Sequence, residues 1–398
     1  MEQSSEVQDN NNPLSSFLQS LKKSSKHLQN KSTFITHNPQ PAIEALFELH
    51  REHETIFSSN PKLSKLSELL FTLRTLLQKH KGSPGNSLKS LIHRQIINYR
   101  IYQVAFAIEA EVQACIDQEN VQNLVKISQD QETVSEEERL RVLKEFENRL
   151  LLGFDSNFQE LVLRAKGFTI LESLLCDSTC SKRIREQAAL CIVGLVEFNR
   201  DVFVGLVLMG PIVQSLISMA SGCSIQVLCS LIRLIKTPLI DEIELDGEIP
   251  RIISLLRSQD LSIQVAAMDC ICEIAYSGRK EVIEAMIEEG LIEKLMEFQR
   301  SKFGDNLVKK ATDQCTEKRN GEMCEEDIEE EEEEEIVRNR PFASCVKTFA
   351  VQVEVGDGLN YQERKALKME ILRRVKEASV SEAEEASIVA EVLWGSSS

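Results

Sequence analysis

The stretch that decides the fold runs from Gly247 to Gly290 and reads GEIPRIISLLRSQDLSIQVAAMDCICEIAYSGRKEVIEAMIEEG. Pro250 suits the first turn of a helix, where a missing N–H costs nothing, and Gly247 suits the break before it. Apolar residues recur after the break at helical spacing, at Ile249, Ile252, Ile253 and Leu256. Asp260 or Ser262 can cap the following helix. The stretch therefore predicts a unit of short helices joined by tight turns.

The same phase recurs on both sides of this stretch. Glycine separates a short helical pattern from an apolar one at Gly167, Gly210, Gly247 and Gly290, with spacings of 43, 37 and 43 residues. A period of about 40–47 residues is typical of armadillo and HEAT repeats, and the chain resembles the armadillo family. The resemblance implies an all-α fold: a right-handed α-solenoid of armadillo repeats preceded by an N-terminal helical bundle.

Composition divides the chain into three parts. Residues 1–36 are rich in Ser, Asn, Gln and Lys and are expected to be a disordered tail. Residues 37–122 are expected to form the bundle, and residues 123–398 the solenoid, with about five repeats and a degenerate first one. The helices expected in the bundle cover Ala42–Phe57, a run from Pro61, Leu88–Cys115 and a shorter piece near Val121. A helical cap over Tyr361–Ala378 and Ser381–Trp394 is expected at the end.

An acidic run interrupts the last repeat. Residues 311–340 hold 13 acidic and 4 basic side chains. A second-helix pattern, Leu291–Phe298, precedes this run, and Pro341–Ala350 after it has the small residues of a third helix. Because like charges at this density do not pack, we expect residues of about 304–340 to form a disordered loop inside the repeat. For Glu329–Glu335, a solvated loop is favoured over weak cation binding or mimicry of a polyanion.

Charge and cysteine content narrow the class of function. The chain has 46 Lys and Arg against 63 Asp and Glu, a net charge of −17, which argues against nucleic acid and anionic membranes as general partners. The longest apolar stretch, Val202–Val213, is shorter than the ~20 residues of a membrane span and is expected to be a buried helix. The first residues lack the apolar core of a signal peptide. Eleven cysteines, several on apolar helix faces, predict a reducing compartment, cytoplasmic or nuclear.

The sequence contains no catalytic constellation. All six histidines lie at or before residue 93, and no phosphate-binding glycine loop, nucleophile elbow or HExxH run occurs. His50 and His53 have the spacing of half a metal site, but no cysteine pair stands near them, so surface histidines are the favoured interpretation. We expect no enzyme activity, no cofactor and no bound metal.

The resemblance places candidate partner-reading residues on the third helix of each repeat. In the nuclear-import adaptors of the armadillo family, a Trp and an Asn four residues later grip a basic peptide. The matching positions here are Leu190 and Gly194, Cys229 and Arg233, Asp269 and Glu273, and Ser344 and Thr348. Neither Trp nor Asn occurs at any of them, which argues against a receptor for nuclear localisation signals. Arg233 and Glu273 are the preferred contacts for another partner, with ordinary surface charges as the alternative.

Resemblance beyond the repeats bears on function. N-terminal helices followed by armadillo repeats resemble plant U-box ubiquitin ligases, and the tail from Arg340 to Gly395 resembles plant armadillo-only proteins. The U-box pattern is missing, so ligase activity is not implied. We expect a non-catalytic scaffold that binds a protein segment on the concave groove of the solenoid. The alternatives are a U-box-less regulator or substrate adaptor of ubiquitin ligation, and an adaptor recruited to membranes by a basic amphipathic helix in Leu14–Lys31. For that last segment, a transient helix in a tail is the favoured interpretation.

Overall fold

The structure is a computed structural model in which residues 63–81, 88–129, 134–300 and 344–394 are described. Within these ranges the chain forms α-helices and short 3-10 segments, and no strand occurs there. The all-α prediction is confirmed. The chain groups into two compact units, of which unit 1 holds residues 1–133 and 154–167 and unit 2 holds residues 134–153 and 168–398.

Several sequence expectations concern residues outside the described ranges. They are the tail 1–36 with its segment Leu14–Lys31, the helix Ala42–Phe57, the pair His50 and His53, and the acidic insertion 304–340. These stay predictions.

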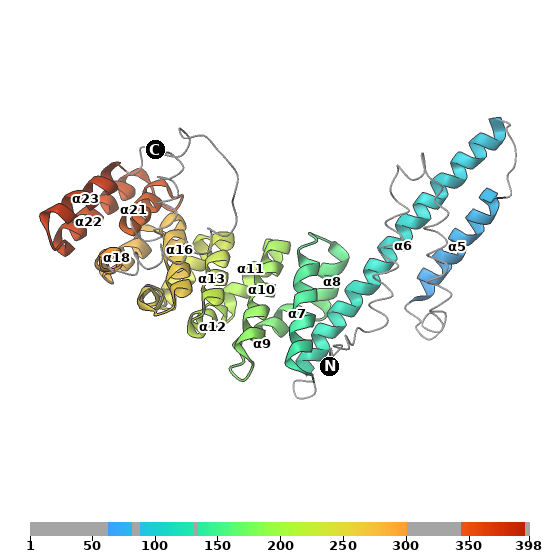
Figure 1. Cartoon of the computed structure of the whole chain (residues 1–398), viewed down its shortest axis with the longest axis horizontal. Coiled ribbons are helices and arrows are strands. Elements are labelled where there is room, and N and C mark those ends of the chain that lie inside the picture. The colour runs from blue at the N-terminus through green and yellow to red at the C-terminus, as the bar shows by residue number, and fades with distance from the viewer. Residues whose placement is uncertain (1–62, 82–87, 130–133, 301–343, 395–398) are drawn as a thin grey trace, which may run out of the picture. The chain divides into compact units, whose positions relative to one another are not determined.

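Unit 1 is built on two long helices, α5 (Ser64–Lys81) and α6 (Leu88–Gln129), which lie side by side (Figure 1). Lys65 Nζ lies 2.5 Å from Glu111 Oε2, so the start of α5 lies beside the middle of α6 and the two helices are antiparallel. Their facing apolar stripes form one core, made of Leu63, Leu66, Leu70, Leu73, Leu76, Ile97, Ile101, Ala105, Ile108 and Val112. A shorter helix, α8 (Ser156–Arg164), packs against α6.

Helix α6 corrects one sequence expectation. The sequence predicts that one helix ends near Cys115 and that a separate helix follows near Val121. Both predictions are wrong, because α6 runs unbroken for 42 residues. The segment between those positions contains neither Gly nor Pro, and Val112 and Val121 are both buried, so nothing in it favours a break. The boundary expected between residues 122 and 123 consequently falls inside this helix.

In the described part of unit 2, three complete three-helix repeats follow one another. The first comprises α11 (Arg200–Met209), α12 (Ile212–Met219) and α13 (Gly222–Ile235). The second comprises α14 (Thr237–Leu245), α15 (Ile249–Ser254) with its 3-10 extension η2 (Leu255–Arg257), and α16 (Leu261–Ser277). The third comprises α17 (Lys280–Glu288), α18 (Leu291–Arg300) and α21 (Cys345–Val355). The helices that precede them are α7 (Glu136–Leu150), α9 (Gly167–Cys176) and α10 (Lys182–Phe198).

The third helices of unit 2 form a continuous row (Figure 1). Each member of the series α7, α10, α13, α16 and α21 contacts the next. Buried small residues such as Ala188 on α10 and Ala266 on α16 allow this close packing. At Gly194 a Cβ would lie only 3.0 Å from Leu150 Cδ1 on α7. A row of this kind makes unit 2 an α-solenoid, as predicted.

The repeat between Gly247 and Gly290 has the turn chemistry that the sequence predicts. Gly247 and Gly290 have φ values of 70° and 76°, in the left-handed region that favours glycine. Pro250 lies in the first turn of α15. The Asp260 side chain accepts a hydrogen bond from the Ser262 backbone N–H and caps α16.

The last repeat is assembled from segments far apart in the sequence. Helices α18 and α21 contact each other and the helix α22 (Tyr361–Ala378), although residues 301–343 separate them in the chain. Asn360 and Glu363 form a capping box at the start of α22. Helix α23 (Glu382–Trp394) packs on α21 and α22. These two helices cover the ranges in which the sequence predicts helices, Tyr361–Ala378 and Ser381–Trp394.

The apolar stretch Val202–Val213 is two helices, and the expectation of one buried helix is wrong. Helix α11 ends at Met209 and α12 begins at Ile212, because Gly210 and Pro211 interrupt the helical hydrogen bonds. Among the described helices, none is by itself long and apolar enough to cross a membrane, and only the pair α11 and α12, bent by 70°, has sufficient length and composition when taken together.

Candidate partner-binding face

Seven of the eight positions predicted to read a partner lie on four consecutive third helices, and the eighth, Ser344, immediately precedes the last of them. We call the sides of α10, α13, α16 and α21 that carry these positions the third-helix face. Arg233, Asp269 and Thr348 are exposed there, and Leu190 and Glu273 are half-buried. Arg233, Asp269 and Glu273 lie close enough to interact across α13 and α16.

The other three predicted positions offer little side-chain surface to a partner. Cys229 is only 6% exposed and lies between α13 and α16. Gly194 has no side chain and packs toward Leu150. Ser344 precedes the first turn of α21, and its backbone carbonyl accepts a hydrogen bond of 3.0 Å from Thr348 Oγ1.

Arg233 and Glu273 form an ion pair that joins two adjacent repeats. Arg233 Nη2 lies 2.7 Å from Glu273 Oε1, and Arg233 Nε donates to the same oxygen at 2.8 Å. The Arg233 side chain remains 63% exposed. The two residues selected separately from the sequence therefore act as one group, because positions one repeat apart face each other across α13 and α16.

Asp269 places a second carboxyl group one helical turn before Glu273. Partial burial raises the pKa of the Asp269 carboxyl, and the nearby Arg233 guanidinium opposes that shift. A cationic or hydrogen-bonding group of a partner would stabilise the ionised form of this carboxyl. The centre of the face thus combines one exposed guanidinium with two carboxylates.

Sequence reasoning missed a cluster at the C-terminal ends of α13 and α16. Lys236 Nζ lies 2.6 Å from Asp357 Oδ2 and 6.0 Å from the centre of the Tyr276 ring. The hydrogen bond to Asp357 raises the pKa of Lys236. Tyr276 follows Glu273 by three residues, so helical periodicity could have selected it. No sequence signal pairs Lys236 with Asp357, which are 121 residues apart.

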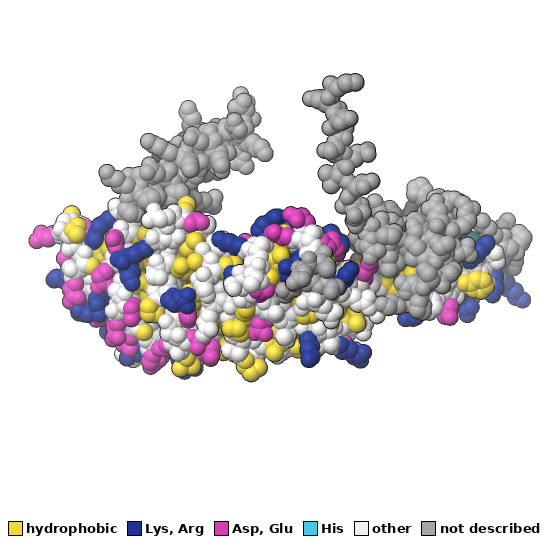
Figure 2. Space-filling view, turned by 90° about the horizontal axis from the view of Figure 1, so that it is seen from below, with side chains coloured by type: hydrophobic (Ala, Val, Ile, Leu, Met, Phe, Trp, Pro, Cys, Tyr) yellow, Lys and Arg dark blue, Asp and Glu magenta, His cyan; other side chains and the backbone are white. Residues whose placement is uncertain are grey.

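Charge on the surface of unit 2 is mixed. Figure 2 shows basic and acidic side chains interspersed over its C-terminal end, with no large patch of one sign on the side displayed. A partner of this surface would meet both charges within a short distance. Non-specific attraction of a polyanion or polycation is therefore not what this surface favours.

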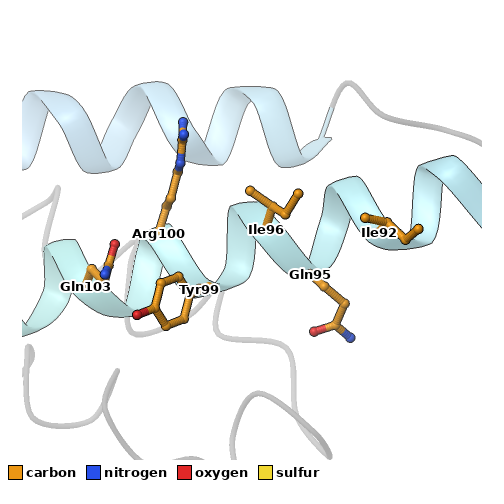
Figure 3. A pocket seen from close by; sticks show the side chains of 6 residues that line it. All are labelled: Ile92, Gln95, Ile96, Tyr99, Arg100 and Gln103. Carbon is orange, nitrogen blue, oxygen red and sulfur yellow. The ribbon is translucent and has the colours of Figure 1, made fainter.

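Unit 1 has a separate apolar feature on α6. A shallow hollow of about 500 Å³ is lined by Ile92, Gln95, Ile96, Tyr99, Arg100 and Gln103 (Figure 3). Ile96 and Tyr99 are exposed, whereas Ile97 and Ile101 of the same helix are buried in the core with α5.

Metal chemistry finds no support within the described ranges. No group of three or more His, Cys, Asp and Glu side chains is arranged there to hold a metal ion.

Comparisons with known proteins give likeness in structure only. No protein-family model and no curated protein sequence matches the chain. A designed armadillo repeat protein, YIII(Dq)4CqI, is 19% identical, with 70% of this chain and 99% of the designed chain covered and a TM-score of 0.41. Another designed armadillo repeat protein, solved in complex with the peptide (KR)4, is 18% identical over 70% of this chain and 98% of its own, with a TM-score of 0.40.

A natural solenoid protein is similar as well. The structure of Kap121p bound to Nup53p is 12% identical, with a TM-score of 0.45, and the match covers 96% of this chain but 33% of that one. The peptide and Nup53p are partners of those proteins. The resemblance to plant U-box proteins stays an interpretation of the sequence.

Proposed function

We propose that unit 2 is a non-catalytic scaffold whose third-helix face binds an extended segment of a protein partner. The observation that carries this proposal is the row of packed third helices, in which each helix contacts the next. The proposed contact residues along this row are Leu190, Arg233, Asp269, Glu273 and Thr348. A solenoid of this kind repeats its binding positions once per repeat, so it suits a long, thin ligand.

The dimensions of the row fit an extended chain. Helices in direct contact have axes about 8–10 Å apart, and an extended segment advances about 3.3–3.6 Å per residue. Every second or third residue of the partner would therefore pass one third helix. Side chains at those positions would meet Thr348, the Asp269 carboxyl, the Arg233 guanidinium and Leu190 in succession.

The ion pair at the centre of the face is available for recognition. An exposed salt bridge contributes only about 0–1 kcal/mol to stability because water screens it. A partner carboxylate could therefore take over the Arg233 guanidinium, or a partner cation could take over Glu273 and Asp269, at little cost in folding free energy. Adjacent groups of both signs also fix the register of a bound segment.

Peptide selection with a charge-reversed variant tests the proposal. A phage-displayed library of random-sequence peptides is selected against the full chain, and the affinity of the selected peptides is measured for Arg233→Glu. We expect the affinity to change at least tenfold, about 1.4 kcal/mol, because three carboxylates would then face the peptide at one point. Affinity should fall for peptides that place a carboxylate at Arg233 and rise for peptides that place a cation at Glu273 and Asp269. The double variant Arg233→Glu with Glu273→Arg reverses the pair and should keep the melting temperature of the wild type.

The chain supplies a matched control. Arg257 and Glu297 form another exposed ion pair between consecutive repeats, with Nη2 and Oε2 3.2 Å apart, but they lie on second helices and outside the third-helix face. Arg257→Glu should leave peptide affinity unchanged. If the selected peptides bind Arg233→Glu as well as the wild type, or if Arg257→Glu weakens them equally, the third-helix face is not the binding site.

The alternatives have less support. No described contact favours regulation of ubiquitin ligation, and membrane recruitment depends on Leu14–Lys31, outside the described ranges.

A further inference from the structure

Two cysteines of unit 2 face each other across the contact between α13 and α16. The Cys270 thiol on α16 reaches the backbone of α13, where it lies 3.4 Å from the carbonyl oxygen of Ile225. Cys229 follows Ile225 by one helical turn on the same side of α13. Of the groups around it, Cys270 also has the largest influence on the pKa of the Cys229 thiol. Because a thiol carries one hydrogen, Cys270 donates either to the carbonyl oxygen or to the Cys229 sulfur.

Helices α7 and α10 are joined by the same kind of contact between a thiol and a backbone carbonyl, but only one thiol is present there. The Cys191 thiol on α10 donates to the carbonyl oxygen of Leu143 on α7, at 3.3 Å. Glu147 follows Leu143 by one helical turn, just as Cys229 follows Ile225 on α13. The position that holds a second thiol on α13 therefore holds a carboxylate on α7. The contact of thiol and carbonyl is therefore a recurring packing feature of this row. The second thiol is particular to the contact between α13 and α16.

Arg233 distinguishes the two thiols. Its Nη2 lies 3.9 Å from Cys229 Sγ. The hydrogen bond from Cys270 lowers the pKa of the Cys229 thiol, burial opposes this, and the Arg233 guanidinium lowers the pKa further. Burial holds the pKa of the Cys270 thiol well above its usual range. Cys229 is thus the nucleophile of the pair, because the thiolate is the reactive form.

At three other cysteines of the third helices, burial is the main influence on the pKa of the thiol. Burial raises the pKa of Cys272 and of Cys345 to about 12. Burial also raises the pKa of Cys191, and the nearby Glu147 carboxylate adds to that shift. An oxidant that reacts with thiolates would therefore select Cys229 among these residues.

We propose that Cys229 and Cys270 are a modification site at which a hydroperoxide converts two thiols into a disulfide that ties α13 to α16. In the first step the Cys229 thiolate sulfur attacks one oxygen of hydrogen peroxide. A sulfur–oxygen bond forms, the oxygen–oxygen bond breaks, and hydroxide leaves. In the second step the Cys270 sulfur displaces the sulfenic hydroxyl group, which leaves as water together with the Cys270 proton. The proton that Cys229 released when it ionised neutralises the hydroxide of the first step. Two thiols are oxidised and one peroxide is reduced to two waters.

The burial of Cys229 favours a small oxidant, and the disulfide would act on the contact between α13 and α16. Cys229 lies beneath Arg233 with 6% of its surface exposed, so a small uncharged peroxide fits the site better than a bulky disulfide reagent. The new bond joins the same two helices that the Arg233–Glu273 ion pair joins. Oxidation therefore locks the contact at the centre of the third-helix face.

Peptide mapping of the oxidised full chain tests the proposal. The folded protein is treated with hydrogen peroxide, alkylated, digested without reductant and analysed by mass spectrometry. We expect a Cys229–Cys270 linked peptide that dithiothreitol removes, a higher melting temperature, and Cys191 still free. Cys229→Ser and Cys270→Ser should each abolish the linked peptide while their circular dichroism spectra stay helical. Absence of this linkage in the folded oxidised wild type, or linkage of Cys229 to Cys272 instead, overturns the proposal.

A gain-of-function variant tests the geometry independently of reactivity. Glu147→Cys places a thiol opposite Cys191, in the position that Cys229 has opposite Cys270. The folded variant should form a second disulfide, to Cys191, at higher pH or with longer oxidation, because no guanidinium activates it. If the introduced thiol stays free under conditions that unfold neither protein, facing positions on neighbouring third helices are insufficient and the geometric argument fails.

Discussion

Glycines at single positions of unit 2 are required for different physical reasons. Gly247 and Gly290 occupy left-handed backbone conformations, which sequence patterns predict well because the reason is local. Gly358 is required by contact: a Cβ there would lie 2.2 Å from the backbone oxygen of Gly278. The adjacent backbone N–H of Asp357 donates to the Tyr276 carbonyl at 2.9 Å and holds the two turns together.

Alanine at two glycine positions should change stability in opposite directions. Gly358→Ala should lower the free energy of unfolding by about 1–3 kcal/mol, because backbone atoms cannot move aside easily. Gly205 lies exposed in the middle of α11, where an added Cβ would meet no atom within 4 Å, so Gly205→Ala should raise it by about 0.5–1 kcal/mol. Urea denaturation of both variants measures the difference. A stabilising Gly358→Ala would mean that the two turns are not in close contact.

Helix α6 has two apolar stripes, one buried and one exposed. The stripe with Ile97 and Ile101 packs on α5, whereas the stripe with Ile96 and Tyr99 is exposed. Apolar spacing in the sequence indicates both stripes equally. Only the position of α5 decides which one enters the core, and this is why the hollow on α6 could not be predicted.

Aspartate substitutions at two neighbouring positions test the difference between the buried and the exposed stripe. Ile97 is 4% exposed and Ile96 is 49% exposed. Ile97→Asp should lower the melting temperature of unit 1 strongly, because it buries an unpaired carboxylate or forces its protonation. Ile96→Asp should change it little. Thermal unfolding followed by circular dichroism gives the comparison, and equal losses in the two variants would contradict the packing of α5 on α6.

At the scale of the whole molecule, the last repeat depends on contacts across residues 301–343. Helix α21 buries Val346 and Phe349 and contacts α16, α18, α22 and α23. Helix α21 follows the acidic run in the sequence, yet it completes a repeat whose first two helices precede that run. The small-residue pattern of Pro341–Ala350 indicated this third helix correctly.

Cleavage within the interval should therefore leave the protein in one piece. A specific protease site is introduced between Thr316 and Gly321, and the cleaved protein is analysed by size-exclusion chromatography. We expect both fragments to elute together without denaturant, because burial of α21 on α16 and α18 holds them. As a control, Phe349→Asp should promote their separation. Separation of the fragments without that substitution would mean that α21 does not belong to the repeat.

The sequence by itself determined that the described segments are helical and where the turns at Gly247 and Gly290 fall. Apolar periodicity, Gly247, Gly290 and the capping residue Asp260 are sufficient for this because helix formation and turn chemistry are local. The sequence did not determine that α6 runs unbroken or that Val202–Val213 is two helices. The tertiary structure alone decided that Arg233 pairs with Glu273, that Cys229 faces Cys270 and that Lys236 meets Asp357. Each of these contacts depends on the register between two packed helices or loops, and that register is set by the sum of many side-chain contacts along the interface.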